Sequence, residues 1–430
     1  MLSRKKMSPG RFIVSGFATV IFIGALLLML PFASHKGISI SFLDALFTST
    51  SAVCVTGLIV VETADTYTIF GRTVIAILIQ IGGLGVASVG IGFIILTGKK
   101  VGIRERVLVK EALNLNSLKG IVKLIRAILL ITLSFELTGA ILSFFVFSKD
   151  YPPLTAIGIS MFHAVSAFNN AGFDILGGFK NLTEYKDNIL LNLTTCGLII
   201  FGGLGFLVIK EIIQKRSFRK FNLHAKVVIV TTIFLLTVGT ILIKLTEKTS
   251  WLAAFFQSTS ARTAGFNTLP IGEITSAGLF VIAILMFIGA SPGSTGGGIK
   301  TTTAFTLLRS LISSATNQHC KAFKRRIPNS VVMSAFTLTI LAICVVGMNT
   351  FMLCLLEPGY TFLQLFFEVT SAFGTVGLST GITPELGIFS KLILILTMFI
   401  GRLGPITIAC MWSYKPASSI SYSEESFTIG

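Results

Sequence analysis

Long and short apolar segments alternate along the chain. Eight long segments, each able to cross a hydrocarbon core of ~30 Å, occupy residues 12–32, 73–96, 121–147, 188–212, 226–245, 278–311, 330–356 and 389–412. Shorter apolar stretches lie within successive pairs of long segments, at residues 42–53, 157–168, 251–259 and 362–373. Their length is typical of re-entrant or buried segments. The order long, short, long occurs four times and predicts an all-α membrane protein with eight transmembrane helices and four re-entrant helices.

Polar loops divide this pattern into four repeats. We expect the repeats at residues 1–98, 99–215, 216–318 and 319–413, followed by a cytoplasmic tail at 414–430. The first apolar segment follows a short basic stretch, as in a signal peptide, but it is long enough to remain as a spanning helix.

Composition supports a membrane protein and excludes most water-soluble enzymes. Of the 430 residues, 53% are hydrophobic and 12% are charged, and the mean hydropathy is +0.86. The six cysteines form no CxxC pair and the four histidines form no HxxxH pair, so neither a disulfide framework nor a zinc site is predicted. A membrane-embedded enzyme would need clustered carboxylate, His or Cys side chains in its spans, where a lone Glu is present. We therefore predict that the protein is not an enzyme.

Basic residues are distributed unevenly between the loops. The N-terminal stretch, the loops at 99–126, 210–226 and 309–326, and Lys415 hold 24 of them, whereas the segments with the short apolar stretches hold nine. Lys and Arg in short loops mark the cytoplasmic side, so we expect both termini to be cytoplasmic in a multi-pass protein of the plasma membrane. This asymmetry also accounts for the formal charge of +17 without a nucleic-acid partner.

The fourfold pattern is most detailed at the ends of the short stretches. Aligned on one glycine, they read SAVCVTGL from residue 51, SAFNNAGF from 166, TSARTAGF from 259 and SAFGTVGL from 371. Each has Ser or Thr six residues before the glycine and Phe ten residues before it. A second glycine follows 24 to 30 residues later, at Gly82, Gly202, Gly289 and Gly401. Single glycines of this kind would be ordinary packing or turn residues, but four matches in register favour a pore.

A strand that follows a half-helix inside a membrane must line water or be buried in protein. Four such strands around one axis would present rings of carbonyl oxygens that can replace the hydration shell of a monovalent cation. A glycine in each strand permits close approach of the backbone to the ion. The predicted selectivity filter comprises Val55, Thr56, Gly57, Asn170, Ala171, Gly172, Thr263, Ala264, Gly265, Thr375, Val376 and Gly377.

These motifs resemble those of the Trk/Ktr/HKT superfamily of potassium transporters. The resemblance rests on VTGL at 55–58, NNAGF at 169–173, ARTAGFN at 261–267 and GTVGL at 374–378, and it covers nearly the whole chain. Because the chain starts directly at the first long helix, it is most similar to the Ktr-type ion-translocating membrane subunit. Each strand keeps only one glycine of the TVGYG sequence of tetrameric potassium channels, which suggests a shorter effective filter.

The resemblance implies a fold, a function and partners. The fold would be four fused M1-P-M2 units, similar to potassium-channel subunits, around a pseudo-fourfold pore. The function would be K+ uptake across the plasma membrane, with Na+ as a coupling or activating ion and no covalent cofactor. The partners would be a second copy in a homodimer and a cytosolic RCK/KTN-type nucleotide-binding regulatory ring.

One long segment contains a glycine-rich interruption that a continuous helix would not tolerate. We name residues 289–298 the gate loop, because the resemblance implies a gate there; it comprises Gly289, Ala290, Ser291, Pro292, Gly293, Ser294, Thr295, Gly296, Gly297 and Gly298. A phosphate-binding loop is disfavoured because Ile299 separates the last glycine from Lys300, and a mere packing irregularity is the remaining alternative. Arg402 occupies the corresponding offset in the fourth repeat and is predicted to bind loop carbonyls.

Other charged residues in the membrane region have less specific interpretations. Lys300 is expected to extend toward the cytoplasmic interface. Glu136 would be either a coupling-ion site or a hydrogen-bonded strut between helices. Arg262 and Glu368 flank the third and fourth strands and are expected to form a salt bridge.

The runner-up function is an alternating-access secondary transporter for cations, a class in which broken helices and repeats are also typical. Repeats of inverted orientation are the common carrier pattern, whereas the repeats here share one orientation. This difference favours the pore.

Overall fold

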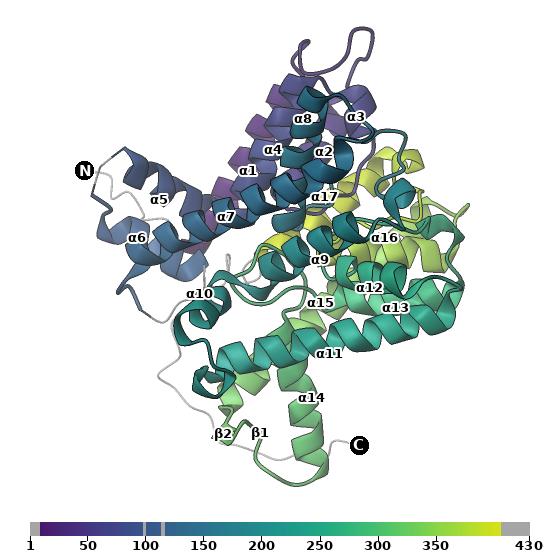
Figure 1. Ribbon diagram of the computed structural model, residues 1–430. Helices are drawn as coiled ribbons and strands as arrows, with labels where there is room; N and C mark the ends of the chain where they lie inside the picture. Colours follow the sequence, from purple (N-terminus) through teal and green to yellow (C-terminus); the bar gives the residue numbers. More distant parts are fainter. Residues whose placement is uncertain (1–8, 98–99, 113–116, 406–430) are drawn as a thin grey trace, which may run out of the picture.

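The computed structural model describes residues 9–97, 100–112 and 117–405, and it confirms an all-α membrane fold of four repeats (Figure 1). The first two repeats comprise α1 (Pro9–Leu28), α2 (Phe42–Val53), α3 (Thr63–Thr66), α4 (Ile69–Leu84), α5 (Val86–Leu96), α6 (Ile103–Ala112), α7 (Ile121–Phe147), α8 (Pro153–Phe168), η1 (Thr183–Tyr185), α9 (Ile189–Leu204) and α10 (Phe206–Lys215). The last two comprise η2 (Phe218–Lys220), α11 (Leu223–Thr246), α12 (Trp251–Ser260), η3 (Ile271–Glu273), α13 (Ser276–Phe287), α14 (Thr301–Ala315), α15 (Asn329–Leu356), α16 (Phe362–Gly374), η4 (Thr383–Glu385) and α17 (Ile388–Leu403). An antiparallel hairpin of β1 (Lys321–Ala322) and β2 (Arg325–Arg326) joins the third repeat to the fourth. The expected tail at 414–430 lies outside the described residues.

Each repeat places a short helix between two longer elements. The short helices are α2, α8, α12 and α16, and each is followed by one of the four predicted filter strands. Their starts are defined by local chemistry: Ser41, Ser250 and Thr361 cap α2, α12 and α16 with side-chain oxygens, while α8 begins at Pro153. Each short helix therefore has a defined start, from which its length sets the position of the strand.

The second long element is bent in the first two repeats and interrupted in the third. Among the described residues, α1, α7, α11 and α15 are long and apolar enough to cross a membrane alone, and the pairs α4–α5 and α9–α10 qualify only as spans bent by 99°. The expected spans at 73–96 and 188–212 are therefore wrong as single helices. The third is interrupted by the gate loop, as predicted, and in the fourth α17 ends at Leu403.

The bends share one backbone geometry. Gly85, Gly205 and Gly404 have φ of 82°, 90° and 86° and ψ of 135°, 138° and 136°. A side chain is strongly disfavoured at such positive φ, so only glycine lets the chain turn there. The tetrapeptides GGLG at 82–85 and 202–205 and GRLG at 401–404 carried this signal in the sequence.

The glycines predicted inside the second long elements lie against the short helices. A Cβ atom built on Gly82, Gly202 or Gly401 would collide with the backbone carbonyl of Val53, Phe168 or Phe373, respectively. In the third repeat, a Cβ on Gly289 would instead collide with the backbone of the gate loop at Gly297. Backbone contact without side chains thus fixes the distance between the short helix and the second helix in three repeats.

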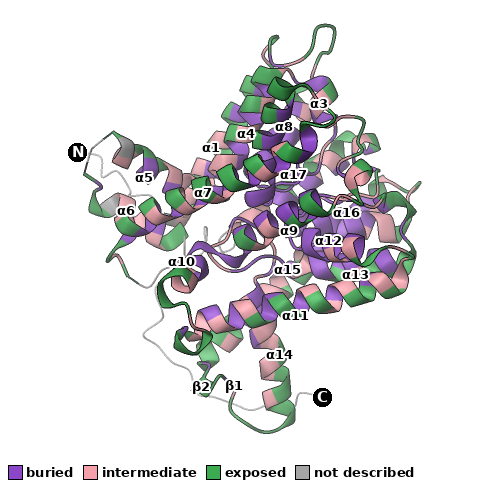
Figure 2. Ribbon diagram, viewed as in Figure 1, coloured by how far each residue is buried: buried purple, intermediate pink, exposed green. Residues whose placement is uncertain are grey.

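Burial follows this arrangement. The centre of the molecule, where α16, α17, α9 and α12 meet, is largely buried, whereas α1, α5, α6 and α14 show exposed faces (Figure 2). Large apolar side chains are exposed there and on α11, such as Phe93 of α5 at 68% exposure and Leu245 of α11 at 76%. Exposed apolar side chains of this size are expected where a protein faces lipid.

A substitution on α9 tests the glycine contact. We expect Gly202→Ala to reduce the stability of the folded protein, because overpacking at a backbone contact costs about 1–3 kcal/mol. Gly197→Ala, on the same helix, has open space around its Cβ and should leave stability unchanged or slightly raised. The measurement is the thermal midpoint of the purified protein in detergent. Equal midpoints for the two variants would contradict the contact.

Candidate ion-conduction site

The four predicted filter strands share an unusual backbone. The residue two positions before each glycine has positive φ, and the values are 52° for Val55, 58° for Asn170, 73° for Thr263 and 50° for Thr375. The glycines follow with φ of 93° at Gly57, 69° at Gly172, 80° at Gly265 and 96° at Gly377. Positive φ is an outlier for β-branched residues such as Val and Thr. Strain of this kind persists only where the surrounding structure fixes it and is concentrated at functional sites.

The four glycines form a closed ring. A Cβ on Gly57 would lie 2.5 Å from the carbonyl oxygen of Ala171, and one on Gly172 would lie 2.7 Å from that of Ala264. A Cβ on Gly265 would likewise collide with the carbonyl oxygen of Val376, and a Cβ on Gly377 would collide with that of Thr56. Each strand therefore touches the next one, from the first repeat through the fourth and back to the first, around one axis.

Hydrogen bonds to the short helices hold the strands. The residue before the glycine donates its N–H to the carbonyl six residues before the glycine in the first, second and fourth repeats, with distances of 2.8, 2.8 and 2.9 Å for Thr56, Ala171 and Val376. The Ser hydroxyls at Ser51 and Ser371 accept the N–H of Gly57 and Gly377 at 3.0 and 3.1 Å. This role explains the Ser in the first and fourth motifs.

The third strand is held differently. Its short helix ends at Ser260, and Ala264 donates to the carbonyl of Ser260 at 2.9 Å. The hydroxyl of Thr259, at the position of Ser51, donates within its own helix to Phe255. Ser166 in the second repeat has a buried hydroxyl with no hydrogen-bond partner. The Ser or Thr hydroxyl six residues before the glycine therefore binds the N–H of that glycine in the first and fourth repeats.

A cavity of about 620 Å³ lies outside the ring, and all four filter glycines line it. Its wall includes the carboxylates of Asp174 and Glu385 and the ammonium of Lys180. Carboxylates at the mouth of a narrow cavity raise the local concentration of cations. The cavity therefore has the position of a vestibule at one mouth of the ring.

A loop from the second repeat, residues 174–182, forms part of the vestibule wall, and we name it the outer loop. Asp65 and Glu62 of the first repeat accept N–H groups of Gly178 and Phe179 at 3.1 and 3.0 Å. Within the loop, Asp174 accepts from the side chain of Asn181 at 2.8 Å. Carboxylates thus hold the loop against the first repeat.

The outer loop also contacts the third repeat. Asn267 donates its N–H to the side-chain oxygen of Asn181 at 3.1 Å, and Leu182 donates to the carbonyl of Asn267 at 3.1 Å. Burial, reinforced by repulsion from Glu62, raises the pKa of the Asp174 carboxyl to about 7. Sequence reasoning missed this loop, because its carboxylates come together only through tertiary contacts between repeats.

The gate loop packs against the fourth filter strand and against the end of α9. Ser291 and Thr295 donate their N–H groups to the carbonyls of Gly203 and Gly202 at 3.0 and 3.3 Å. Gly297 donates to the hydroxyl of Thr375, a filter residue, at 2.9 Å. The loop is therefore bound to the second repeat and to the fourth filter strand.

Two cationic side chains bind the carbonyls of the gate loop. Arg402 donates to the carbonyl of Thr295 and also to the carbonyl of Gly82 in the first repeat. Lys300 donates from Nζ to the carbonyls of Gly296 and Gly297 at 2.7 and 3.3 Å. The expectation that Lys300 extends toward the interface is therefore wrong, because unpaired loop carbonyls are available to it nearby.

The carboxylate of Glu368 is held by hydrogen bonds rather than by an ion pair. Glu368 accepts hydrogen bonds from Ser379, Thr380 and Thr383, at distances from 2.6 to 3.0 Å, and makes no ion pair with Arg262 in the described part of the chain. The expected salt bridge is wrong, because local hydroxyl and N–H donors already surround the carboxylate.

Glu136 belongs to a network behind the second filter strand. It accepts from the side-chain amide of Asn169 at 3.0 Å, and the same amide donates to Gln80 of α4 at 2.8 Å. Asn169 is the C-cap of α8, directly before the strand. This geometry supports the strut interpretation of Glu136.

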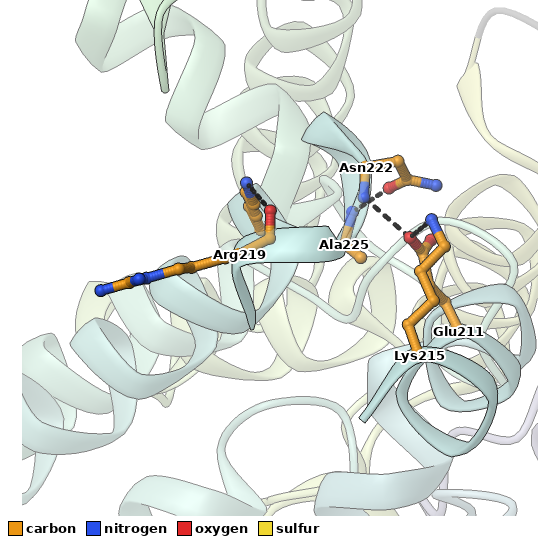
Figure 3. Close-up of polar contacts among 6 residues, drawn as sticks. Glu211, Lys215, Arg219, Asn222 and Ala225 are labelled. Atoms are coloured by element: carbon orange, nitrogen blue, oxygen red, sulfur yellow. Dashed lines mark hydrogen bonds and ion pairs between the residues drawn. The ribbon is translucent and has the colours of Figure 1, made fainter. Parts of the chain in front are cut away.

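Helix α10, which follows the bend after α9, is bound to the gate loop. Phe206, the first residue of α10, donates its N–H to the carbonyl of Gly293 in the gate loop at 3.1 Å. At the other end of α10, Glu211 accepts from Lys215 at 2.6 Å and from the N–H of Asn222 at 2.7 Å, just before α11 (Figure 3). Helix α10 is therefore fixed at both ends.

Together, the fold and the ring define a membrane protein with four channel-like repeats around a single pathway. Comparison with known proteins agrees. Residues 7–247 and 225–422 match the family model TrkH, described as cation transport protein. The chain belongs to this family.

Relatives and a solved structure extend the comparison. The chain is 38% identical to the Ktr system potassium uptake protein B of Bacillus subtilis, over 98% of this chain and 97% of that protein. It is 39% identical to the potassium/sodium uptake protein NtpJ of Enterococcus hirae, over 99% and 98%. The crystal structure of the potassium transporter TrkH from Vibrio parahaemolyticus has the same fold, with a TM-score of 0.76, 20% identity and coverage of 96% of this chain and 86% of that one.

Substitution of a filter glycine tests the ring. We expect Gly377→Ser to lower the preference for K+ over Na+ by at least roughly tenfold, corresponding to ~1.4 kcal/mol, because the new Cβ would press on the carbonyl of Thr56. The measurement is the ratio of K+ to Na+ flux into liposomes. Gly359→Ser, at a glycine with open space around it, is the control and should keep the wild-type ratio. An unchanged ratio in a folded Gly377→Ser protein would exclude this carbonyl ring as the filter.

The outer loop predicts a dependence on external pH. The pKa of Asp174 is raised to about 7, so its contribution to the stability of the loop is greatest when it is protonated and declines as pH rises toward 7. Between pH 5.5 and 8 the carboxyl becomes charged, which loosens the loop and adds a negative charge to the vestibule. We expect Rb+ uptake to rise over this range.

Asp174→Asn should flatten the pH dependence, since the amide does not titrate. Glu385→Gln serves as the control, because Glu385 accepts a hydrogen bond from Tyr360 rather than from the outer loop. A wild-type pH profile in the Asp174→Asn protein would contradict the assignment.

Proposed function

We propose that the chain is the ion-translocating subunit of a potassium uptake system, in which K+ crosses the membrane through the ring of filter carbonyls. The observation that carries this proposal is the closed ring of four glycines, each in contact with the next strand. The printed names of two relatives, a potassium uptake protein and a potassium/sodium uptake protein, support the choice of ion. The family is one of cation transport proteins, not of enzymes.

Selection would occur at backbone oxygens. A K+ ion entering from the vestibule must lose water, and carbonyl dipoles of several strands replace it when they surround the ion together. The strained backbone at Val55, Asn170, Thr263 and Thr375 is rigidly supported by the short helices, so the oxygens are positioned before the ion arrives. One glycine per strand limits the number of such layers, in line with a short filter.

Flux would be controlled by the gate loop. Its polar backbone lies between the filter and the cytoplasmic side and is held by Arg402 and by the second repeat. Glycines give the loop many alternative conformations, so closing it costs backbone entropy that these contacts must offset.

The remaining proposals concern partners and orientation. A homodimer and a cytosolic ring of RCK/KTN-type nucleotide-binding subunits are supported by relatives named as components of a Ktr system. Cytoplasmic termini and a plasma-membrane location are supported by the distribution of basic residues. Na+ as a coupling or activating ion is supported by the name of the Enterococcus relative.

The function is tested by ion uptake. The purified chain in liposomes should take up Rb+ or K+ down a gradient, and comparison with and without Na+ measures the sodium effect. Equal permeability to K+, Na+ and a large organic cation would contradict a selective potassium pathway.

The gate assignment makes its own prediction. Arg402→Ala removes charge-assisted hydrogen bonds worth about 1.5–3 kcal/mol each, and the open population should rise roughly 10- to 100-fold if the bonds exist only in the closed state. A protein with a shortened gate loop should behave similarly. Filter preference should remain near wild type in both. Unchanged flux in both folded variants would leave the loop as a packing irregularity.

A further inference from the structure

We propose that Lys180 of the outer loop is a tethered cation at the mouth of the filter, which lowers the occupancy of the vestibule by cations and excludes divalent cations more strongly than monovalent ones. The inference rests on the proposed function and deepens it, because it names a residue that controls which ions reach the ring of carbonyls. Its basis is the charge that Lys180 brings to a cavity shared with the four filter glycines.

The first argument is the position of Lys180 on the wall of the vestibule. This wall also contains all four filter glycines. Among the described residues that form it, Lys180 is the only Lys or Arg, and the carboxylates are those of Asp174 and Glu385. A cation that approaches the ring therefore passes one ammonium as well as two carboxylates, and the balance of their fields sets its local concentration.

The second argument is that the backbone of Lys180 is fixed. Lys180 donates its N–H to the carbonyl of Gly177 at 3.4 Å, and its own carbonyl accepts from the N–H and the hydroxyl of Thr183 at 3.2 and 2.8 Å. The side chain of the next residue, Asn181, binds Asp174 on one side and the third repeat on the other. The outer loop thus holds the base of the Lys180 side chain at one place on the cavity wall.

The third argument is the strained backbone on both sides of Lys180. Phe179 and Asn181 have φ of 54° and 50°, and positive φ is an outlier for a bulky residue such as Phe. Glu62 accepts the N–H of Phe179 at 3.0 Å, and Asn181 accepts the N–H of Asn267 at 3.1 Å. Strain that neighbouring repeats maintain in this way is concentrated at functional sites.

The fourth argument is that the ammonium is charged and only loosely held. Glu184 binds it at 2.6 Å, and both side chains are 61% exposed. The hydrogen bond to Glu184 raises the pKa of Lys180 above its ordinary value, so the ammonium keeps its charge at neutral pH. An exposed ion pair contributes little stability, and the Lys180 side chain can therefore leave Glu184 and extend over the vestibule.

Electrostatics gives the size of the effect and its dependence on ion charge. For an ion roughly 4 to 8 Å from the ammonium in water, repulsion lowers occupancy about two- to fivefold. The repulsion energy is proportional to the charge of the ion, so a divalent ion experiences twice the energy and the square of the factor, roughly 4- to 25-fold. Lys180 therefore favours monovalent over divalent cations before the filter is reached.

The experiment measures Rb+ uptake by the complete chain in liposomes at low ionic strength. Lys180→Met should lower the half-saturating Rb+ concentration roughly two- to fivefold, and inhibition by Ba2+, a divalent ion close to K+ in size, should become roughly 4- to 25-fold more sensitive. The maximal rate and the ratio of K+ to Na+ flux should stay at wild-type values, because the filter carbonyls are unchanged. Lys180→Arg keeps the charge and should match wild type.

A cysteine at the same position separates charge from shape. In Lys180→Cys, a membrane-impermeant thiol reagent that adds a trimethylammonium group should return the half-saturating concentration toward wild type. A reagent that adds a sulfonate group should lower it further. Both reagents act on protein that is already folded, so a folding defect cannot produce shifts of opposite sign. The same reagents applied to the wild-type chain measure any effect of its six native cysteines.

Ionic strength gives a second readout that a structural role of Lys180 would not change. Choline chloride at about 0.15 M shortens the screening length to about 8 Å. The difference between wild type and Lys180→Met should therefore shrink as this salt is added. A difference that is independent of ionic strength would contradict an electrostatic role.

Lys186 provides the matched control, because it lies in the same segment between α8 and α9. It lines a different cavity of about 320 Å³, whose wall contains Asp187 and Glu247 but none of the filter glycines. Lys186→Met should leave the half-saturating Rb+ concentration and Ba2+ inhibition unchanged. Equal shifts in Lys186→Met and Lys180→Met would indicate a general effect of surface charge and would overturn the specific role of Lys180.

The outcomes separate this inference from the proposed function. Wild-type half-saturation and Ba2+ inhibition in Lys180→Met, together with K+-selective uptake, would overturn the role of Lys180 and leave the ion pathway intact. Absence of K+-selective uptake in every protein, wild type included, would overturn the proposed function and this inference with it. Selective uptake with opposite shifts for the two thiol reagents would support both.

Discussion

The structure depends on one constraint, which is that every backbone N–H and C=O inside a bilayer needs a partner. The chain satisfies it with helices except at three kinds of position: the filter strands, the bends after the second helices, and the gate loop. At these positions the missing helical bonds are replaced by bonds to the short helix of the same repeat, to another repeat or to a cation. Thr295 illustrates this, since its N–H is bound by Gly202 and its carbonyl by Arg402. The gate loop therefore depends on other repeats for its backbone partners.

The third repeat departs from the fourfold pattern, and the loop proposed as the gate lies at this departure. Its short helix ends five residues before the filter glycine, whereas the others end three or four residues before it. Ala264 binds the carbonyl of Ser260, and the gate loop interrupts the second long element between α13 and α14. In the other three repeats the corresponding glycine lies against the short helix, whereas Gly289 lies against Gly297 of the gate loop. The third repeat is thus the place where the chain leaves the helical pattern for a ten-residue loop.

Sequence patterns predicted the parts of this structure that repeat. Hydrophobic length predicted the order of long and short elements, and the register of SAVCVTGL and its three counterparts predicted four equivalent strands, because both depend on local chain properties. That these strands form a selectivity filter stays a prediction. The bends at Gly85 and Gly205 were missed although GGLG occurs twice, since hydropathy is continuous across them. Lys300, Glu368 and the outer loop could not be predicted, because their partners are distant in sequence and chosen by packing.

Packing explains why an Arg is present at position 402 of the fourth repeat but not at the corresponding position of the first. Alignment on the glycine of the second helix places Arg402 level with Gly83, Gly203 and Ala290 in the other repeats. A Cβ on Gly83 would collide with the side chain of Asn169, so a long side chain has no room in the first repeat.

Alignment on the filter glycine places Cys54 of the first repeat level with Asn169 of the second, and the side chain of Cys54 is smaller. The small residue leaves space for a long side chain, and that side chain reaches Gly82 of the first repeat and Thr295 of the third. One Arg from the fourth repeat thus binds backbone of two others. An Arg in place of Gly83 would collide with the side chain of Asn169, which is hydrogen-bonded to Glu136. The first repeat therefore has no room for the Arg that the fourth repeat carries at the same position.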